Sequence, residues 1–241
     1  MTTHRRVQQQ PTFILHHRPF RDTSQILDLI SRDHGKLSVV ARGSRGARSR
    51  LKGILRPFMP LSASWVIKSD LGTLTGAEVR GAPLSLSGDA LLSGYYVNEL
   101  ILHFLHRHDP QPEIFDAYVN TIQALATVGD DVASCLRQFE IELLRQVGYA
   151  LNLDCEHASQ DALDKGQYYE YRVEQGPVAV SRTEGPLIFS GEMLSAISKQ
   201  QFTEPGVLRA ANRLLRDVIS FHLGGKELKS RKVLLDIHRQ K

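Results

Sequence analysis

Residues 36–53 read KLSVVARGSRGARSRLKG, and the change of pattern within them decides how the N-terminal part of the chain is interpreted. Leu37 and Val39 alternate with residues that face the other way, which is the period-two pattern of a β-strand. From residue 42 to residue 53 no hydrophobic period remains, and Gly, Ser and Ala separate the charges. The stretch therefore predicts a strand that runs into a long, exposed and positively charged loop.

The other parts of the first 80 residues also predict β structure. In SASWVIK, residues 62–68, the apolar residues Ala63, Trp65 and Ile67 alternate with their neighbours. Glycines punctuate the short apolar runs at positions 35, 72 and 76. Short strands separated by glycines are typical of a small meander or barrel.

Beyond residue 83 the hydrophobic period becomes helical. It predicts a helix that begins near Asp89, a second that begins at Pro112, and a third over residues 132–147 that ends at Gly148. A final helix is expected to begin after Thr203 as its N-cap, with Pro205 in its first turn. These helices are amphipathic and should pack against one another.

The region between residues 152 and 190 predicts a polar loop followed by two short strands, with a turn at Gly176 and Pro177. We therefore expect an α+β protein of two domains. Residues 1–82 form a small β-barrel domain, and residues 83–241 form a mainly helical domain with a loop and β-hairpin insertion near 152–190.

Composition narrows the class of protein. The chain has 241 residues, of which 41% are hydrophobic and 23% charged, as in ordinary globular proteins. No apolar run is long enough to cross a bilayer, and the first residues lack the apolar core of a secretory signal. The two cysteines, Cys135 and Cys155, cannot build a disulfide framework. A cytoplasmic protein without membrane contact is expected.

Charge is distributed unevenly along the chain. The net charge of +4 combines +9 over residues 1–80, −11 over residues 81–204 and +6 over residues 205–241. Basic ends around an acidic middle suggest a surface that binds a polyanion, with the middle serving protein contacts.

The positively charged loop after residue 41 is the first candidate site. Its cations have no acidic neighbour in the segment, and arginine forks bind phosphate oxygens bidentately. The alternative is a solvated loop that only aids solubility. Aromatic residues that could stack on bases are more simply explained as core; they are Phe13, Phe20, Phe58 and Trp65. The candidate DNA-binding cations here are Arg42, Arg45, Arg48, Arg50, Lys52 and Arg56.

A second basic group lies near the C-terminus. Arg209, Arg213 and Arg216 share one face of the final predicted helix. A solvated helix face is the alternative, but only Asp217 is a close acidic neighbour. The tail adds further candidate DNA-binding residues, which are Lys226, Lys229, Arg231 and Lys232.

Catalytic and metal signatures are weak. Glu99, His103 and His106 share a helical face, and Cys155 lies near His157, yet no ligand pair has the spacing of a structural zinc site. The phosphate-binding, nucleophile and metalloprotease motifs are missing. We expect no catalytic residues, no metal and no cofactor, although a hydrolase that uses the histidines stays open as an alternative.

Five segments together resemble the RecO family of bacterial recombination mediators over nearly the whole chain. They are HHRPFRDTSQILDLISRDHGKLSVVARGSR (16–45), LKGILRPFMPL (51–61), GYYVNELI (94–101), LRQFEIELLRQVGY (136–149) and LGGKELKSRK (223–232). The resemblance implies an OB-fold barrel followed by a helical domain. It also implies binding of single- and double-stranded DNA, annealing of complementary strands without ATP, and a role in DNA repair and homologous recombination.

The resemblance further implies protein partners and their sites. RecO proteins bind the acidic C-terminal tail of the single-stranded-DNA-binding protein, and Arg137 matches the arginine that receives it. RecR is a partner in loading RecA, which is engaged indirectly. The basic loop matches the family's DNA-contacting region. Many relatives carry a four-cysteine zinc site, of which this sequence keeps only Cys155. A cytoplasmic, nucleoid-associated location is implied.

An RNA-binding or ribosome-associated OB-fold protein is a second alternative, beside the hydrolase. It shares the charge pattern but not the extended resemblance. Oligomeric state, the stoichiometry with RecR, metal binding through Cys155 and the histidines near it, and the cations that meet each DNA strand are left open by the sequence.

Overall fold

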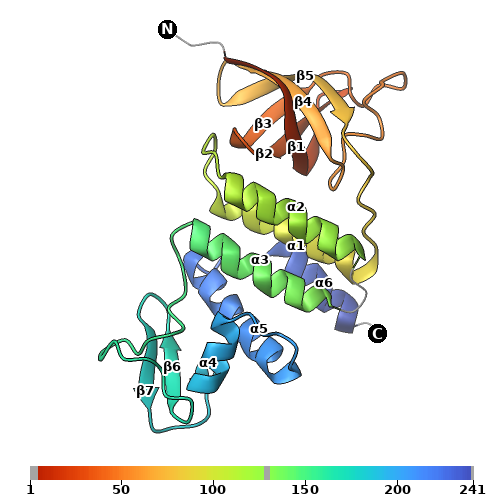
Figure 1. The fold of residues 1–241 in the computed structure, drawn as a ribbon. Coiled ribbons are helices and arrows are strands. Elements are labelled where there is room, and N and C mark those ends of the chain that lie inside the picture. The colour runs from red at the N-terminus through yellow and green to blue at the C-terminus, as the bar shows by residue number, and fades with distance from the viewer. Residues whose placement is uncertain (1–4, 128–130, 240–241) are drawn as a thin grey trace. The chain divides into compact units, whose positions relative to one another are not determined.

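The computed structural model describes residues 5–127 and 131–239. The chain packs into two compact units. The first combines residues 1–128 with residues 228–241, and the second comprises residues 129–227. Figure 1 shows the strands of the first unit in red and orange and its helices α1 and α2 in yellow and green.

A closed five-stranded barrel begins the first unit. Its strands are β1 (Arg5–Phe20), β2 (Ser24–Ser31), β3 (Gly35–Ala41), β4 (Leu61–Ile67) and β5 (Leu71–Val79). Their order is β1-β2-β3-β5-β4, with β4 pairing back to β1 and only β3 and β5 parallel. The predicted small barrel with an OB-fold is thereby confirmed.

Alternate residues of the strands fill the barrel interior. Ile14, Leu27, Val39 and Trp65 are at most 1% exposed and lie in this core. The period-two pattern read from KLSVVA and SASWVIK therefore marks the inward faces of β3 and β4. Gly35, which follows the turn between β2 and β3, has a left-handed φ of +63°, and a Cβ there would lie 2.0 Å from the Asp109 carbonyl oxygen, so only glycine fits.

Three helices complete the first unit: α1 (Gly88–Phe104), α2 (Pro112–Thr127) and α6 (Lys229–Arg239). Phe13 of β1 packs against α2, with ring centroids 6.1 Å from Phe115 and 5.3 Å from Tyr118. The apolar faces of α1 and α2 are buried as their periodicity predicts. The expected starts near Asp89 and at Pro112 are confirmed, whereas α6 was not predicted.

The second unit contains α3 (Val132–Gln146), α4 (Gly191–Ser198), α5 (Pro205–His222) and a small sheet. That sheet pairs β7 (Gly176–Val180) with β6 (Tyr168–Arg172) and β6 with β8 (Ile188–Ser190). The expected hairpin insertion is confirmed, and β8 and α4 extend it. The turn itself lies at residues 173–175, because Gly176 and Pro177 already pair with β6.

Helix α5 begins one residue later than expected. Its N-cap is Glu204 rather than Thr203, and the Glu204 side chain makes no capping hydrogen bond. Pro205 starts the first turn as predicted, because its missing N–H and fixed φ suit that position. The ending of α3 before Gly148, whose φ is +85°, is confirmed.

The expected domain boundary at residues 82–83 falls in the exposed segment between β5 and α1, and it stays a prediction. None of the described helices is both long enough and apolar enough to span a membrane.

Candidate nucleic-acid interface

The predicted basic loop joins β3 to β4, and residues 42–56 are called the basic loop below. It contains no strand, as expected, but it is ordered by successive turns. The backbone N–H groups of Gly46, Ser49 and Lys52 each donate to the carbonyl three residues earlier, over 3.0 to 3.2 Å. Each turn reverses the chain within three residues, so charges close in sequence stay close in space.

Apolar residues hold the basic loop to the barrel. Leu55 is 6% exposed and belongs to the barrel core, while Leu51 and Ile54 are half-buried against it. These three residues therefore hold the C-terminal part of the loop against the barrel. Its apolar side chains face inward, and the cations between them remain exposed.

The basic loop is also tied to the turn between β1 and β2. Arg45 donates from its backbone N–H to the carbonyl of Thr23 at 2.8 Å, and Gly43 donates to the Ser24 hydroxyl at 3.4 Å. The Arg45 guanidinium reaches the carbonyl of Arg21 at 3.4 Å. The backbone of Arg21, which was not among the predicted site residues, therefore lies against the basic loop, and its exposed guanidinium lies 5.3 Å from the ring centroid of Phe20. The presence of Arg21 in HHRPFRD was the available signal.

The six cations predicted for this loop are exposed and lie together on one connection. Among the residues that the structure describes, no carboxylate lies within 4.0 Å of any of them. Their charge is therefore not neutralised internally, and a polyanion can compete for it without first breaking an ion pair. They are Arg42, Arg45, Arg48, Arg50, Lys52 and Arg56.

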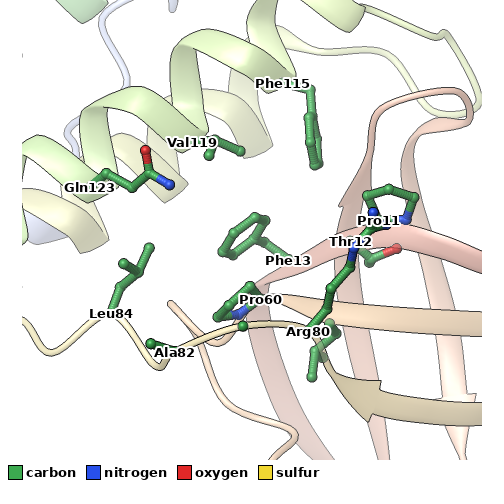
Figure 2. A pocket seen from close by; sticks show the side chains of 12 residues that line it. Pro11, Thr12, Phe13, Pro60, Arg80, Ala82, Leu84, Phe115, Val119 and Gln123 are labelled. Carbon is green, nitrogen blue, oxygen red and sulfur yellow. The ribbon is translucent and has the colours of Figure 1, made fainter.

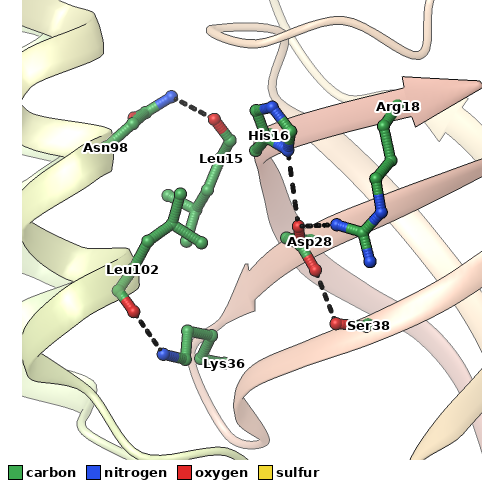
Figure 3. Close-up of polar contacts among 8 residues, drawn as sticks. All are labelled: Leu15, His16, Arg18, Asp28, Lys36, Ser38, Asn98 and Leu102. Atoms are coloured by element: carbon green, nitrogen blue, oxygen red, sulfur yellow. Dashed lines mark hydrogen bonds and ion pairs between the residues drawn. The ribbon is translucent and has the colours of Figure 1, made fainter. Parts of the chain in front are cut away.

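The outer face of β2 and β3, which oligonucleotides use in many OB-folds, carries a buried carboxylate in this chain. Figure 3 shows Asp28 between His16, Arg18 and Ser38. Asp28 is 9% exposed; its carboxylate accepts from Ser38 at 2.5 Å and pairs with Arg18 at 3.2 Å and His16 at 3.5 Å. A buried carboxylate is unfavourable for phosphate at this position.

Helix α1 lies against the same side of the barrel, as Figure 3 also shows. Asn98 donates to the Leu15 carbonyl at 2.8 Å, and the Lys36 ammonium donates to the Leu102 carbonyl at 2.6 Å. Burial lowers the pKa of Lys36, and the charge of Arg107 lowers it further. Helix α1 thus covers part of this strand face, whereas the basic loop is an open cationic surface of the barrel.

The arginines of α5 lie in different environments. Arg209 is exposed, and no described carboxylate pairs with it. Arg213 donates to the Ile188 carbonyl at 3.1 Å and lies 4.6 Å from the ring centroid of Phe189. Arg216 pairs with Asp217 at 3.0 Å. The assignment of these three to DNA stays a prediction; Arg213 also holds α5 to β8.

The basic tail is divided between the two units. Lys226 belongs to the second unit, whereas Lys229, Arg231 and Lys232 belong to α6 in the first. Lys226, Lys229 and Lys232 are exposed, and Arg231 is half-buried. These residues are therefore not one continuous patch along one helix, and their role in DNA binding stays a prediction.

Glu99 of α1 fixes the start of α6. Its carboxylate accepts from the backbone N–H groups of Lys229 and Ser230, both at 2.9 Å, and from the Ser230 hydroxyl at 2.6 Å. Burial raises the pKa of Glu99, but these hydrogen bonds outweigh burial, so its pKa lies below the ordinary value. Sequence patterns gave Glu99 as a possible metal ligand; in the structure it caps a helix.

Arg137, the expected site for the acidic tail, lies in α3 and is 7% exposed. Its guanidinium pairs with Glu140, which is 1% exposed. The Arg137 Nε has no hydrogen-bond partner among the described residues. The buried guanidinium thus keeps one unused donor beside a carboxylate partner.

The aromatic side chains considered as base-stacking residues are largely buried, and the candidate metal ligands do not form a cluster among the described residues. Phe13, Phe58 and Trp65 are at most 6% exposed and belong to the interior, and Phe20 is half-buried. The described residues contain no group of three or more histidine, cysteine or acidic side chains arranged to hold a metal.

The sequence of the chain is similar to known proteins over both its N-terminal and its C-terminal parts. Residues 5–82 match the family model "Recombination protein O N terminal", and residues 85–232 match "Recombination protein O C terminal". The chain is 40% identical over 238 residues to the "DNA repair protein RecO" of Aromatoleum aromaticum, covering 98% of this chain and 99% of that protein. The proteins of the same name from Dechloromonas aromatica and Coxiella burnetii are 36% and 39% identical. These alignments cover 98% and 95% of this chain, and 99% of each relative.

Proposed function

The chain belongs to the RecO family of DNA repair proteins, and on this premise we propose that its basic loop binds the phosphate backbone of single- and double-stranded DNA. The family supports a role in DNA repair and recombination. The observation that carries the DNA-binding site is the set of six loop cations without a described carboxylate partner. Binding of such cations to DNA is favourable because it releases the counterions condensed on the phosphates.

The proposed reaction is the annealing of complementary strands. Two strands repel each other through their phosphates, and cations between them lower that repulsion. Base pairing then supplies the free energy, so no nucleotide hydrolysis is needed. The protein contributes charge and local concentration, because the turns and the Arg45 hydrogen bond hold the charges together.

The partner proteins are proposed from the family. The acidic tail of the single-stranded-DNA-binding protein would pair a carboxylate with Arg137 of α3. Arg137 is nearly buried and already pairs with Glu140. The tail carboxylate must therefore displace or share Glu140, using the free Nε. Interaction with RecR, and through it the loading of RecA, completes the proposal.

Annealing of strands that are coated with the cognate single-stranded-DNA-binding protein tests this function. Annealing that requires the acidic tail supports a mediator that is recruited through the tail. Annealing that is equally fast with the tail deleted contradicts recruitment through it. Competition between RNA and DNA of equal length separates this function from general RNA binding.

A further inference from the structure

A cavity of about 280 Å³ lies in the first unit between the barrel and α2. Figure 2 shows Val119 and Gln123 of α2 on one side and Ala82 and Leu84, from the segment after β5, on the other. Phe13 and Pro60 lie between them. The cavity is smaller than the roughly 300–1,000 Å³ that accommodates drug-sized molecules. Its size suits one large side chain of a partner.

The chemistry of the lining is apolar with one cation. Apolar side chains from β1, the 60–61 segment, residues 82–84 and α2 make most of the wall. The Thr12 hydroxyl is already used, because it donates to the Gln10 carbonyl at 2.9 Å. Arg80 is exposed, and its side chain makes no hydrogen bond or ion pair with any described residue. A carboxylate is therefore the group that complements this site.

Backbone hydrogen bonds and ring packing hold the walls in place. The Arg80 backbone N–H donates to the Pro60 carbonyl at 2.8 Å, and the Leu84 N–H donates to the Phe58 carbonyl at 3.3 Å. Phe13 and Phe115 pack against each other and are each 5% exposed. A preformed pocket loses little conformational freedom when a partner side chain enters it.

We propose that this cavity is a docking site for a peptide segment of a partner protein, one that presents an apolar side chain next to a carboxylate. The apolar side chain fills the space between Phe13 and Val119, and the carboxylate pairs with Arg80. Such an anchor in a pocket is the usual form of an interface hot spot. A nucleic acid fits less well, because Phe13 and Phe115 offer no open ring face for a base.

N-acetyl-phenylalanine, which combines a phenyl ring with a free carboxylate, is the probe. Methyl NMR of the full chain should show saturable shifts at Leu84 and Val119, with a dissociation constant on the order of a millimolar. The neutral N-acetyl-phenylalanine amide should bind about fivefold to tenfold more weakly. Arg80→Gln should weaken binding of the acid by a similar factor and leave binding of the amide unchanged.

Ala82→Trp provides a second variant at an exposed position, where the indole can cover the cavity, and Ala82→Ser is its control. Ala82→Trp should abolish the shifts of the probe while DNA affinity stays at the wild-type level. Absence of saturable shifts in wild type, or equal binding of acid and amide, overturns the proposal. Shifts at Leu84 and Val119 caused by a short oligonucleotide assign the site to nucleic acid, and shifts caused by raising the protein concentration assign it to a second copy; either result overturns it.

Discussion

The backbone N–H of Arg45 lies 2.8 Å from the carbonyl oxygen of Thr23 and donates to it. This hydrogen bond joins the basic loop to the β1–β2 turn, two connections that are well separated in sequence. The backbone of Arg21 consequently lies beside the basic loop. Because apolar loop residues pack on the barrel core, the fold itself holds the loop in place.

Reversing the charge of Arg42 and Arg48 tests the basic loop directly. Neither side chain forms a hydrogen bond or an ion pair with a described residue, so Arg42→Glu with Arg48→Glu should leave the fold intact. DNA affinity at low salt should fall by at least about tenfold, to a similar degree for all sequences. The measurement is fluorescence anisotropy with labelled single strands of two different sequences.

Lys165→Glu with Lys199→Glu is the matched control, because it changes the net charge equally at two exposed positions in the second unit. Its affinity should remain within about twofold of wild type. An equal loss in both double variants would mean that net charge, and not the loop, governs binding.

Glu140→Gln should increase the affinity of the protein for the acidic tail peptide. The substitution removes the carboxylate that now pairs with Arg137, so the peptide carboxylate no longer has to displace it. The free protein should become less stable, because a buried guanidinium is left without its ion pair. Calorimetric titration with the peptide and thermal unfolding with and without it measure both effects.

Arg137→Gln combined with Glu140→Gln is the corresponding control, since it removes both charges without leaving either one alone. It should fold and should not bind the peptide. Retained peptide affinity in this double variant would place the tail elsewhere on the protein.

Glu99→Gln should weaken α6 in a pH-dependent way. The pKa of Glu99 is lowered in the folded state, so its carboxylate adds stability above its unfolded pKa of about 4.3. That contribution disappears as pH falls through the folded pKa. The difference in unfolding free energy between wild type and variant should therefore be largest above about pH 5 and shrink below about pH 4.

Denaturant unfolding over this pH range measures the effect, and amide exchange at Lys229 and Ser230 locates it. Glu192→Gln, at an exposed position in the first turn of α4, controls for loss of a carboxylate. A difference between wild type and Glu99→Gln that does not change from pH 6 to pH 3.5 would exclude a role for the charged form.

Leu55→Ala should lower the free energy of unfolding by about 2–4 kcal/mol, because it opens a cavity where the basic loop enters the barrel core. Leu71→Ala, at a position 36% exposed, should change it by less than about 1 kcal/mol. Chemical denaturation compares the two. Equal effects would show that Leu55 does not anchor the loop.

Local sequence patterns predicted much of the fold. Period-two alternation around Val39 and Trp65 predicted strands, and period-3.6 repeats predicted the first three helices, because burial of one face leaves its mark on neighbouring residues. The basic loop was predictable because its residues show no hydrophobic period. The OB-fold order of the strands came from the resemblance.

Contacts between distant residues were not predictable from these patterns. Glu99 and Ser230 are 131 positions apart, so nothing local indicated that a possible metal ligand caps α6. Arg209, Arg213 and Arg216 have the same spacing pattern in the sequence. The contact between the Arg213 guanidinium and the Phe189 ring could not be predicted from that pattern. The contact of Arg21 with the basic loop was missed because it depends on the approach of that loop to the β1–β2 turn.

The salt dependence of single-strand binding tests the central claim most directly, with wild type compared with the Arg42→Glu, Arg48→Glu variant. If about six loop cations contact phosphates, the logarithm of the association constant should fall with the logarithm of salt with a slope of about −4, and the variant should be shallower by about 1 to 1.5. A wild-type slope near zero, or the same slope in both proteins, would contradict phosphate binding by the basic loop.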